Sequence, residues 1–198
     1  TVSELLDRAE RYRSYWGQDG GITVSGGEAL LQLDFLIELF EEAHRRGINT
    51  CLDTSAKPYA GTPAQERLLA ATDIVLLDIK HIDPERHRQL TGQTNENILA
   101  CARHLSDMGV RTWIRHVLVP GWTDDEESLR RLRAFIDTLR NIERVEVLPY
   151  HTMGLFKWKN LGLHYRLEGV EPPTTEKVKW AEQFFSSATI GDVSPFHA

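Results

Sequence analysis

GITVSGGE, residues 21–28, is a short apolar run that ends in two glycines and a carboxylate. Two glycines let the backbone turn sharply and bring its N–H and C=O groups against a ligand, because no Cβ stands in the way. The carboxylate of Glu28, placed directly after Gly26 and Gly27, can receive an ammonium group. An ordinary turn from a strand to a helix has the same appearance, so the rest of the chain has to separate the two interpretations.

Later strands of the chain also end in polar side chains. Apolar strand-like runs alternate with amphipathic helical patterns, which predicts a parallel sheet with right-handed crossovers. In an open doubly wound sheet the ligand uses two or three strand ends, whereas a barrel brings all of them to one mouth. Because all five expected strands end in candidate groups, we predict an incomplete barrel of five strands. The later strand ends are Asp53-Thr54, Asp78-Ile79-Lys80, Arg115 and His151.

The expected elements form one helix followed by five strand–helix pairs in a single domain over residues 1–186. Thr62 and Thr123 are predicted to cap helices, and residues 154–159 are predicted to form a loop. Residues 187–198 lack periodicity and are predicted to be a frayed tail. We expect strands at about 21–25, 48–53, 74–80, 111–119 and 144–150, and helices at about 2–15, 33–46, 63–71, 95–108, 124–139 and 174–186, with a short helix opening at Asp83-Pro84.

Composition excludes several classes of protein. The chain has 198 residues, of which 41% are hydrophobic and 26% charged, which is ordinary for a globular protein of one domain. Its net charge of −6 argues against general nucleic-acid binding, and no apolar run is long enough to span a bilayer. The cytoplasm is the expected compartment. Cys51 and Cys101 lack the spacing of a metal or cluster site and are predicted to be buried free thiols.

The two-residue period of a strand places charged side chains on a shared face. Leu76, Asp78 and Lys80 fall on one side of their strand, as Cys51 and Asp53 do on theirs and Trp113 and Arg115 on theirs. Salt bridges among these charges would be a purely structural explanation. The adjoining glycine pair instead favours a zwitterionic small molecule. Its ammonium would meet Glu28 and the Gly26 and Gly27 backbone, its carboxylate Lys80 or Arg115, and a hydroxyl Asp78. His151 stays ambiguous between a surface residue and a functional one.

Five motifs in this order resemble those of the pyruvate formate-lyase activating enzymes, a family of the radical S-adenosylmethionine superfamily. The resemblance covers the chain from Thr1 to about Glu182. The motifs are Gly21-Ile22-Thr23-Val24-Ser25-Gly26-Gly27-Glu28-Ala29-Leu30-Leu31-Gln32, Thr50-Cys51-Leu52-Asp53-Thr54, Leu77-Asp78-Ile79-Lys80, Trp113-Ile114-Arg115 with Val119-Pro120-Gly121-Trp122, and Leu148-Pro149-Tyr150-His151.

The resemblance implies a partial (β/α)6 barrel and a radical reaction. That family cleaves S-adenosyl-L-methionine reductively with a [4Fe–4S] cluster, and the resulting radical abstracts hydrogen from a glycine of a partner enzyme. The implied partners are pyruvate formate-lyase or another glycyl radical enzyme, and an electron donor of the flavodoxin or ferredoxin type. Neither nucleic acid nor membrane is implied as a partner.

The resemblance also implies roles for single residues. Gly26, Gly27 and Glu28 would hold the methionine amino group, and Asp78, Ile79 and Lys80 would line the nucleoside and methionine site. The residues Arg115 and His151 would lie near the methionine end and near the ribose or adenine, respectively. A monovalent-cation site beside the cofactor is implied for Asp53, Thr54, Asp78 and the carbonyl of Leu76.

The chain departs from this family in one large respect. The family's Cys-x3-Cys-x2-Cys loop, which binds the cluster, is absent from these residues. The expectation is a fragment that lacks the first strand and the cluster loop and that does not form the radical by itself. A smaller departure is Ser55-Ala56, where the family more usually has Asn-Gly.

The sequence leaves two alternative functions open. A Schiff-base aldolase would use Lys80, although Asp78 on the same face would raise the pKa of that amine rather than lower it. A non-catalytic module would instead bind a glycyl radical enzyme through residues 154–159.

Overall fold

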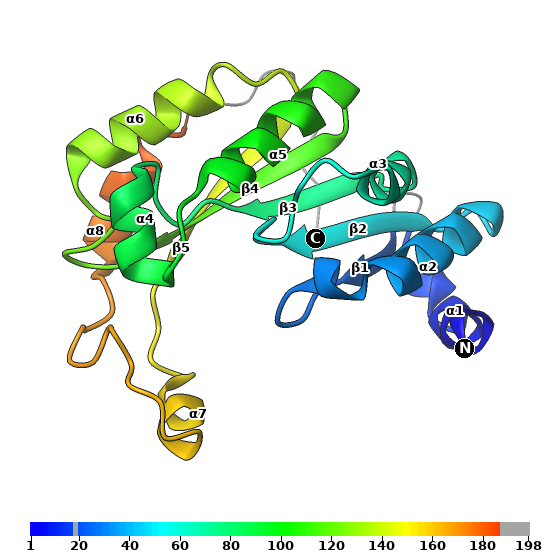
Figure 1. Ribbon diagram of the computed structural model, residues 1–198, viewed down its shortest axis with the longest axis horizontal. Coiled ribbons are helices and arrows are strands. Elements are labelled where there is room, and N and C mark those ends of the chain that lie inside the picture. The colour runs from blue at the N-terminus through cyan, green and yellow to red at the C-terminus, as the bar shows by residue number, and fades with distance from the viewer. Residues whose placement is uncertain (18–19, 187–198) are drawn as a thin grey trace. The chain divides into compact units, whose positions relative to one another are not determined.

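The computed structural model describes residues 1–17 and 20–186 (Figure 1). The predicted tail, residues 187–198, lies outside the described part of the chain. Helices and strands alternate along the sequence, as predicted. The helices are α1 (Val2–Glu10), α2 (Leu33–Arg45), α3 (Pro63–Ala70), α4 (Pro84–Thr91), α5 (Glu96–Met108), α6 (Glu126–Ile136), α7 (Leu155–Asn160) and α8 (Thr175–Glu182), with 3-10 turns η1 (Arg13–Tyr15) and η2 (Ala29–Gln32).

Five strands form a parallel sheet in the order β1-β2-β3-β4-β5. Neighbours in the sheet are therefore also neighbours in the sequence, with no point at which the order reverses. A doubly wound sheet has such a reversal, whereas the strands of a β/α barrel follow each other in sequence. The predicted fold class is confirmed on this point. The strands are β1 (Gly21–Val24), β2 (Asn49–Thr54), β3 (Ile74–Asp78), β4 (Arg111–Leu118) and β5 (Ile142–Pro149).

The chain divides into two compact units. Unit 1 comprises residues 1–78, 96–113 and 139–141, and it contains β1, β2 and β3 with helices α1, α2, α3 and α5. Of the described residues, unit 2 comprises 79–95, 114–138 and 142–186, with α4, α6, α7, α8 and β5. The residues of β4 are shared between the two units.

The core of unit 1 follows from the stripe on α2. Leu36, Leu39, Phe40 and Ala43 recur at helical spacing and are buried where α2 contacts α1, α3 and β2. The predicted cap at Thr62 is confirmed, since Thr62 begins α3 in a capping box, and Thr1 caps α1 in the same way.

A small apolar cluster in unit 2 joins three segments of the chain. Val119, Tyr150 and Leu167 are buried together, with Trp122 and Tyr165 packed against them. The strand β5 contacts α8 in the same unit. This cluster fixes the chain directly after β4 and after β5, where the predicted residue His151 follows. Arg115, predicted at a strand end, lies within β4 instead.

Some sequence predictions in unit 2 are wrong. Residues 154–159 form mostly helix α7 rather than a loop. Thr123 does not cap α6, which begins at Glu126 with Asp125 as its cap. The Thr123 side chain is buried and bonds within its own loop instead.

In unit 1, Cys101 is buried as predicted but Cys51 is only half-buried. In the part of the chain that the structure describes, none of the helices has the length and hydropathy of a membrane span.

Candidate active site

The turn after β1 presents bare backbone to solvent. Ser25, Gly26 and Gly27 are exposed, and a Cβ added to either glycine would meet nothing within 4 Å. Gly26 has a φ of +150°, a conformation that L side chains rarely adopt. The peptide groups of this turn are therefore accessible to a ligand.

The carboxylate of Glu28 is held by donors from the end of β2. Its Oε1 accepts from the Leu30 N–H at 3.1 Å and from Thr54 Oγ1 at 2.5 Å. Its Oε2 accepts from the Ser55 N–H at 3.0 Å and from Ser55 Oγ at 2.6 Å. An ionised carboxylate has about four acceptor positions, so protein donors fill this one. Glu28 thus fastens the glycine turn to the end of β2.

The hydrogen bonds that hold Glu28, called here the clamp, continue through Ala56. Thr54 Oγ1, besides donating to Glu28, accepts from the Ala56 N–H at 2.9 Å. Ala56 is fully buried and has a φ of +52°, in the left-handed region that favours glycine. The departure from the family's Asn-Gly noted in the sequence therefore falls on a strained position of this clamp.

The predicted strand faces are confirmed in β2 and β3. Cys51, Asp53, Leu76 and Asp78 alternate with buried neighbours and are half-buried themselves. Asp53 is paired with Leu76 in the parallel register, so the structure brings these two residues of the predicted cation site side by side. The Thr54 side chain lies on the buried face of β2 and points to Glu28. Asp53 lies on the opposite face of the strand.

In unit 2 the chain after β3 is tied to β4 by backbone and histidine bonds. The Ile79 N–H donates to the Arg115 carbonyl at 3.0 Å. His116 is buried, with Nδ1 at 2.9 Å from the Ile79 carbonyl and Nε2 at 3.2 Å from the Thr123 carbonyl. Lys80 and Arg115 are half-buried. His116 has no role predicted from the sequence, although its position on the buried face of β4 is a signal that could have indicated one.

Thr123 closes the loop that follows β4. Its Oγ1 donates to the Val117 carbonyl at 2.7 Å and accepts from the Val119 N–H at 2.8 Å. The loop Val119-Pro120-Gly121-Trp122 is thereby pinned at both ends. The bonds of Thr123 and His116 together fix the backbone next to the predicted residues Ile79 and Arg115.

His151 lies apart from these bonds. It follows β5 and the buried Tyr150, and its side chain is exposed. No hydrogen bond fixes the ring to a described residue in the way that His116 is fixed, so its predicted role near a nucleoside stays a prediction.

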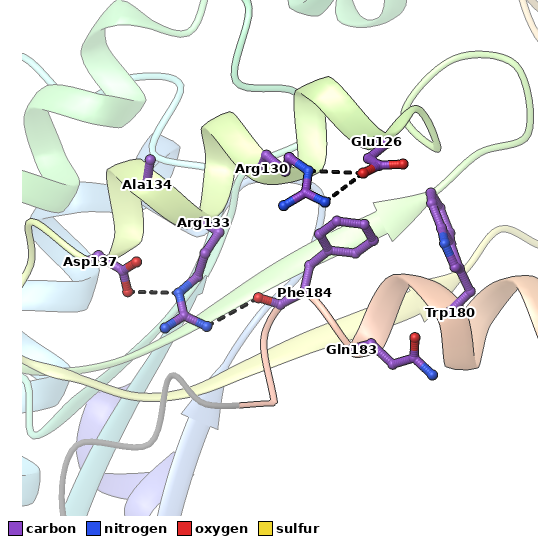
Figure 2. A pocket seen from close by; sticks show the side chains of 8 residues that line it. All are labelled: Glu126, Arg130, Arg133, Ala134, Asp137, Trp180, Gln183 and Phe184. Carbon is purple, nitrogen blue, oxygen red and sulfur yellow. Dashed lines mark hydrogen bonds and ion pairs between the residues drawn. The ribbon is translucent and has the colours of Figure 1, made fainter.

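A cavity of about 580 Å³ lies between α6 and the C-terminal part of α8, and none of the predicted residues lines it. Figure 2 shows the side chains that line this cavity. Its charged groups are satisfied within the cavity wall: Arg130 bonds Glu126, and Arg133 bonds Asp137 and the Phe184 carbonyl. The Arg130 guanidinium also lies 5.4 Å from the centre of the Phe184 ring. These contacts join α6 to the segment after α8 and do not resemble a binding site.

Comparison with known proteins decides the family. A model described as "Radical SAM superfamily" matches residues 1–132. The pyruvate formate-lyase-activating enzyme of Streptococcus mutans is 53% identical over 193 residues, which is 96% of this chain and 73% of that protein. Its counterpart in Staphylococcus epidermidis is 52% identical over 189 residues, covering 93% and 75%. This chain belongs to the pyruvate formate-lyase-activating enzymes of the radical SAM superfamily.

A solved structure agrees with this family in fold. A domain of the pyruvate-formate lyase-activating enzyme from Bacteroides vulgatus superposes with a TM-score of 0.69, at 24% identity, covering 85% of this chain and 94% of that one. The identity is low, so the likeness supports the fold alone. The partial barrel class predicted from the strand ends is confirmed.

The radical SAM family implies a [4Fe–4S] cluster, and the residues present here do not fit one. The chain has two cysteines, and the thiol of Cys101 is buried, which raises its pKa to about 12. Over residues 1–17 and 20–186, no group of three or more His, Cys, Asp or Glu side chains is placed to hold a metal ion. The described residues therefore do not hold a cluster by themselves.

Proposed function

We propose that this chain carries the S-adenosylmethionine-binding part of an enzyme that installs a glycyl radical in pyruvate formate-lyase. The observation that carries the proposal is the 53% identity with an activating enzyme across 96% of the chain. The exposed glycine turn beside a fastened carboxylate adds support, because it offers accessible peptide groups at a strand end. The relatives described above are activating enzymes, not aldolases.

Within unit 1, the glycine turn is proposed to hold the methionine amino group. The Glu28 carboxylate has its acceptor positions filled by Leu30, Thr54 and Ser55, so the direct acceptors for an ammonium group are the carbonyls of the turn. Glu28 then acts as a positioning residue that fixes Gly26 and Gly27, and its charge still favours a cation nearby.

The cation site is proposed on the partly exposed face of β2 and β3. Asp53, Asp78 and the carbonyl of Leu76 would supply oxygen ligands, which hard cations prefer. Since the Thr54 hydroxyl is bonded to Glu28 and Ala56, Thr54 would contribute through its carbonyl.

In unit 2, the proposed cofactor residues are those that the family resemblance assigns. Ile79 and Lys80 would line the nucleoside and methionine site, Arg115 would lie near the methionine end, and His151 near the ribose or adenine. The bond of His116 to the Ile79 carbonyl supports a fixed backbone at this point. An electron donor of the flavodoxin or ferredoxin type is proposed as a second partner.

A glycine substitution tests the proposed binding role. Gly27→Ala adds a Cβ that meets nothing within 4 Å, so the fold should be unchanged while the ligand meets an extra methyl group. Gly154→Ala, at an equally open glycine, is the matched control. In the full-length protein, we expect Gly27→Ala to weaken S-adenosylmethionine binding about tenfold, measured by calorimetry.

The reaction itself is tested by the glycyl radical signal of pyruvate formate-lyase in electron paramagnetic resonance. Absence of that signal with the unaltered, cluster-loaded full-length protein would refute the proposed function. Equal cofactor affinity of the two glycine variants would instead refute only the role of the turn.

A further inference from the structure

Residues 151–166, called here the α7 arm, expose an unusual amount of apolar surface. Every residue from 151 to 164 is exposed except the half-buried Gly154. The exposed fractions reach 73% for Met153, 59% for Phe156 and 70% for Leu161, and Leu155, Trp158 and Leu163 are exposed as well. Proteins that function alone rarely display contiguous apolar patches of this kind, and those that do usually bind something there.

The base of the arm is fixed in unit 2. Tyr165 donates its hydroxyl hydrogen to the Tyr150 hydroxyl at 3.0 Å, and Tyr150 is part of the buried cluster of that unit. The rings of Trp158 and Tyr165 lie 5.2 Å apart, and Arg166 Nη1 donates to the Gln89 carbonyl at 2.6 Å. Figure 1 shows α7 separated from α4, α6 and α8 of the same unit. The base of the α7 arm is therefore held in unit 2, while its apolar side chains are exposed to solvent.

The charge of the arm is opposite to that of the whole chain. Lys157, Lys159 and Arg166 lie between His151 and Leu167, a stretch that contains no Asp or Glu, whereas the chain as a whole carries −6. A basic patch on an acidic protein attracts acidic partners and repels further copies of the protein itself.

A groove in the arm indicates what kind of partner would fit. It has a volume of about 460 Å³ and is lined by the apolar side chains of Phe156, Trp158 and Leu163, with Lys159 and Glu168 at its wall. A concave, mostly apolar groove with a few polar groups accepts inserted side chains. Binding to a bilayer surface instead requires a helix with one face that is apolar along its whole length. Helix α7 has only six residues, two of which are lysines, and is too short to form such a face.

We propose that the α7 arm is a docking surface for an acidic polypeptide segment of the protein substrate, with apolar side chains of that segment seated in the groove. The inference rests on the proposed function, because that function requires a protein substrate. It adds the surface and the chemistry of the segment that is recognised.

Two pairs of substitutions in the full-length protein test the proposal against purified pyruvate formate-lyase. Phe156→Ser with Leu161→Ser removes the apolar contact, and Lys157→Glu with Lys159→Glu reverses the charge. Tyr12→Ser with Tyr15→Ser, and Arg8→Glu with Arg11→Glu, make matched changes at exposed positions of unit 1. We expect each arm variant to bind at least about tenfold more weakly, and the controls to be unchanged. The charge variant should also lose the decrease of affinity between about 50 and 500 mM salt.

The outcomes separate the inference from the function on which it rests. If the unaltered protein does not bind pyruvate formate-lyase, the proposed partner is wrong and the inference falls with it. If it binds, and the arm variants bind as tightly as their controls, only the inference is overturned. Arm-dependent binding to anionic phosphatidylglycerol vesicles, or arm-dependent self-association, in place of substrate binding would likewise overturn it.

Discussion

The hydroxyl of Thr54 donates a hydrogen bond of 2.5 Å to the carboxylate of Glu28, across 26 residues of sequence. This bond joins the ends of two parallel neighbours, β1 and β2, at the level of the glycine turn. Glu28, which the sequence predicts to bind a ligand, therefore holds the glycine turn in place.

Removing the Glu28 carboxylate should therefore destabilise unit 1. Glu28→Ala leaves four donors without their acceptor, and we expect a loss of about 2–4 kcal/mol in the free energy of unfolding. Glu28→Gln keeps one oxygen and should lose about half as much. Urea unfolding measures both changes, with the exposed helix residue Glu38→Ala as control. A Glu28→Ala variant as stable as that control would show that the clamp does not form.

The loop after β4 should depend on one hydroxyl. Thr123→Val keeps the shape of the side chain but leaves the Val119 N–H and the Val117 carbonyl without their partner. We expect a loss of about 2–4 kcal/mol in the free energy of unfolding, because the bond to the Val119 N–H is buried and the bond to the Val117 carbonyl is partly buried. Thr138→Val removes a comparable bond of 2.7 Å from an exposed site and should change the stability little. Equal effects of the two substitutions would contradict this account.

Stability should fall as the pH falls from 7.5 to 5 because of His81. Burial, followed by the nearby Arg86 guanidinium, lowers the pKa of His81 to about 4. As the pH falls, the unfolded chain protonates His81 near pH 6.5, whereas the folded chain does not. The contribution of His81 to the free energy of unfolding is therefore complete above pH 6.5 and decreases as the pH falls from 6.5 to the folded pKa of about 4. Burial lowers the pKa of His87 in the same direction. His81 contributes up to about 3 kcal/mol.

Urea midpoints across this pH range measure the effect. His81→Asn retains an acceptor for the Asp83 N–H, which His81 Nδ1 accepts at 2.9 Å, but has no proton to take up. The variant should show a flatter pH dependence than the unaltered protein. An unchanged slope would assign the pH dependence to other groups.

The two thiols should react at very different rates. Burial raises the pKa of Cys101 to about 12, followed in effect by the charges of Glu28 and Glu66, so its thiolate fraction at pH 8 is about one in ten thousand. Cys51 is half-buried. A colorimetric thiol reagent should therefore titrate one fast thiol in the folded protein and the second only in denaturant. Cys51→Ser should remove the fast phase, and its persistence in that variant would contradict the burial of Cys101.

The local sequence was sufficient for the strand faces. Apolar and polar side chains alternate with period two in β2 and β3, and the phase of Asp53 and Asp78 is decided by backbone geometry alone. The caps of α1 and α3 were predictable for the same reason, since Thr1 and Thr62 bond to residues three positions away. The parallel sheet followed from the alternation of strand-like runs with amphipathic helices, whereas its strand order was seen only in the structure.

Tertiary structure decided the residues whose partners are distant. Thr123 looks like a helix cap in sequence, but it bonds to Val117 and Val119 because the loop folds back on β4, and Asp125 takes the cap. The six residues of α7 are too few to show helical periodicity, so the sequence predicts a loop there. The sequence by itself determined the strand ends at which polar residues collect, because those depend on neighbours along the chain. Only the folded structure decided that Glu28 is saturated by Thr54 and Ser55, because those donors reach it through the pairing of β1 with β2.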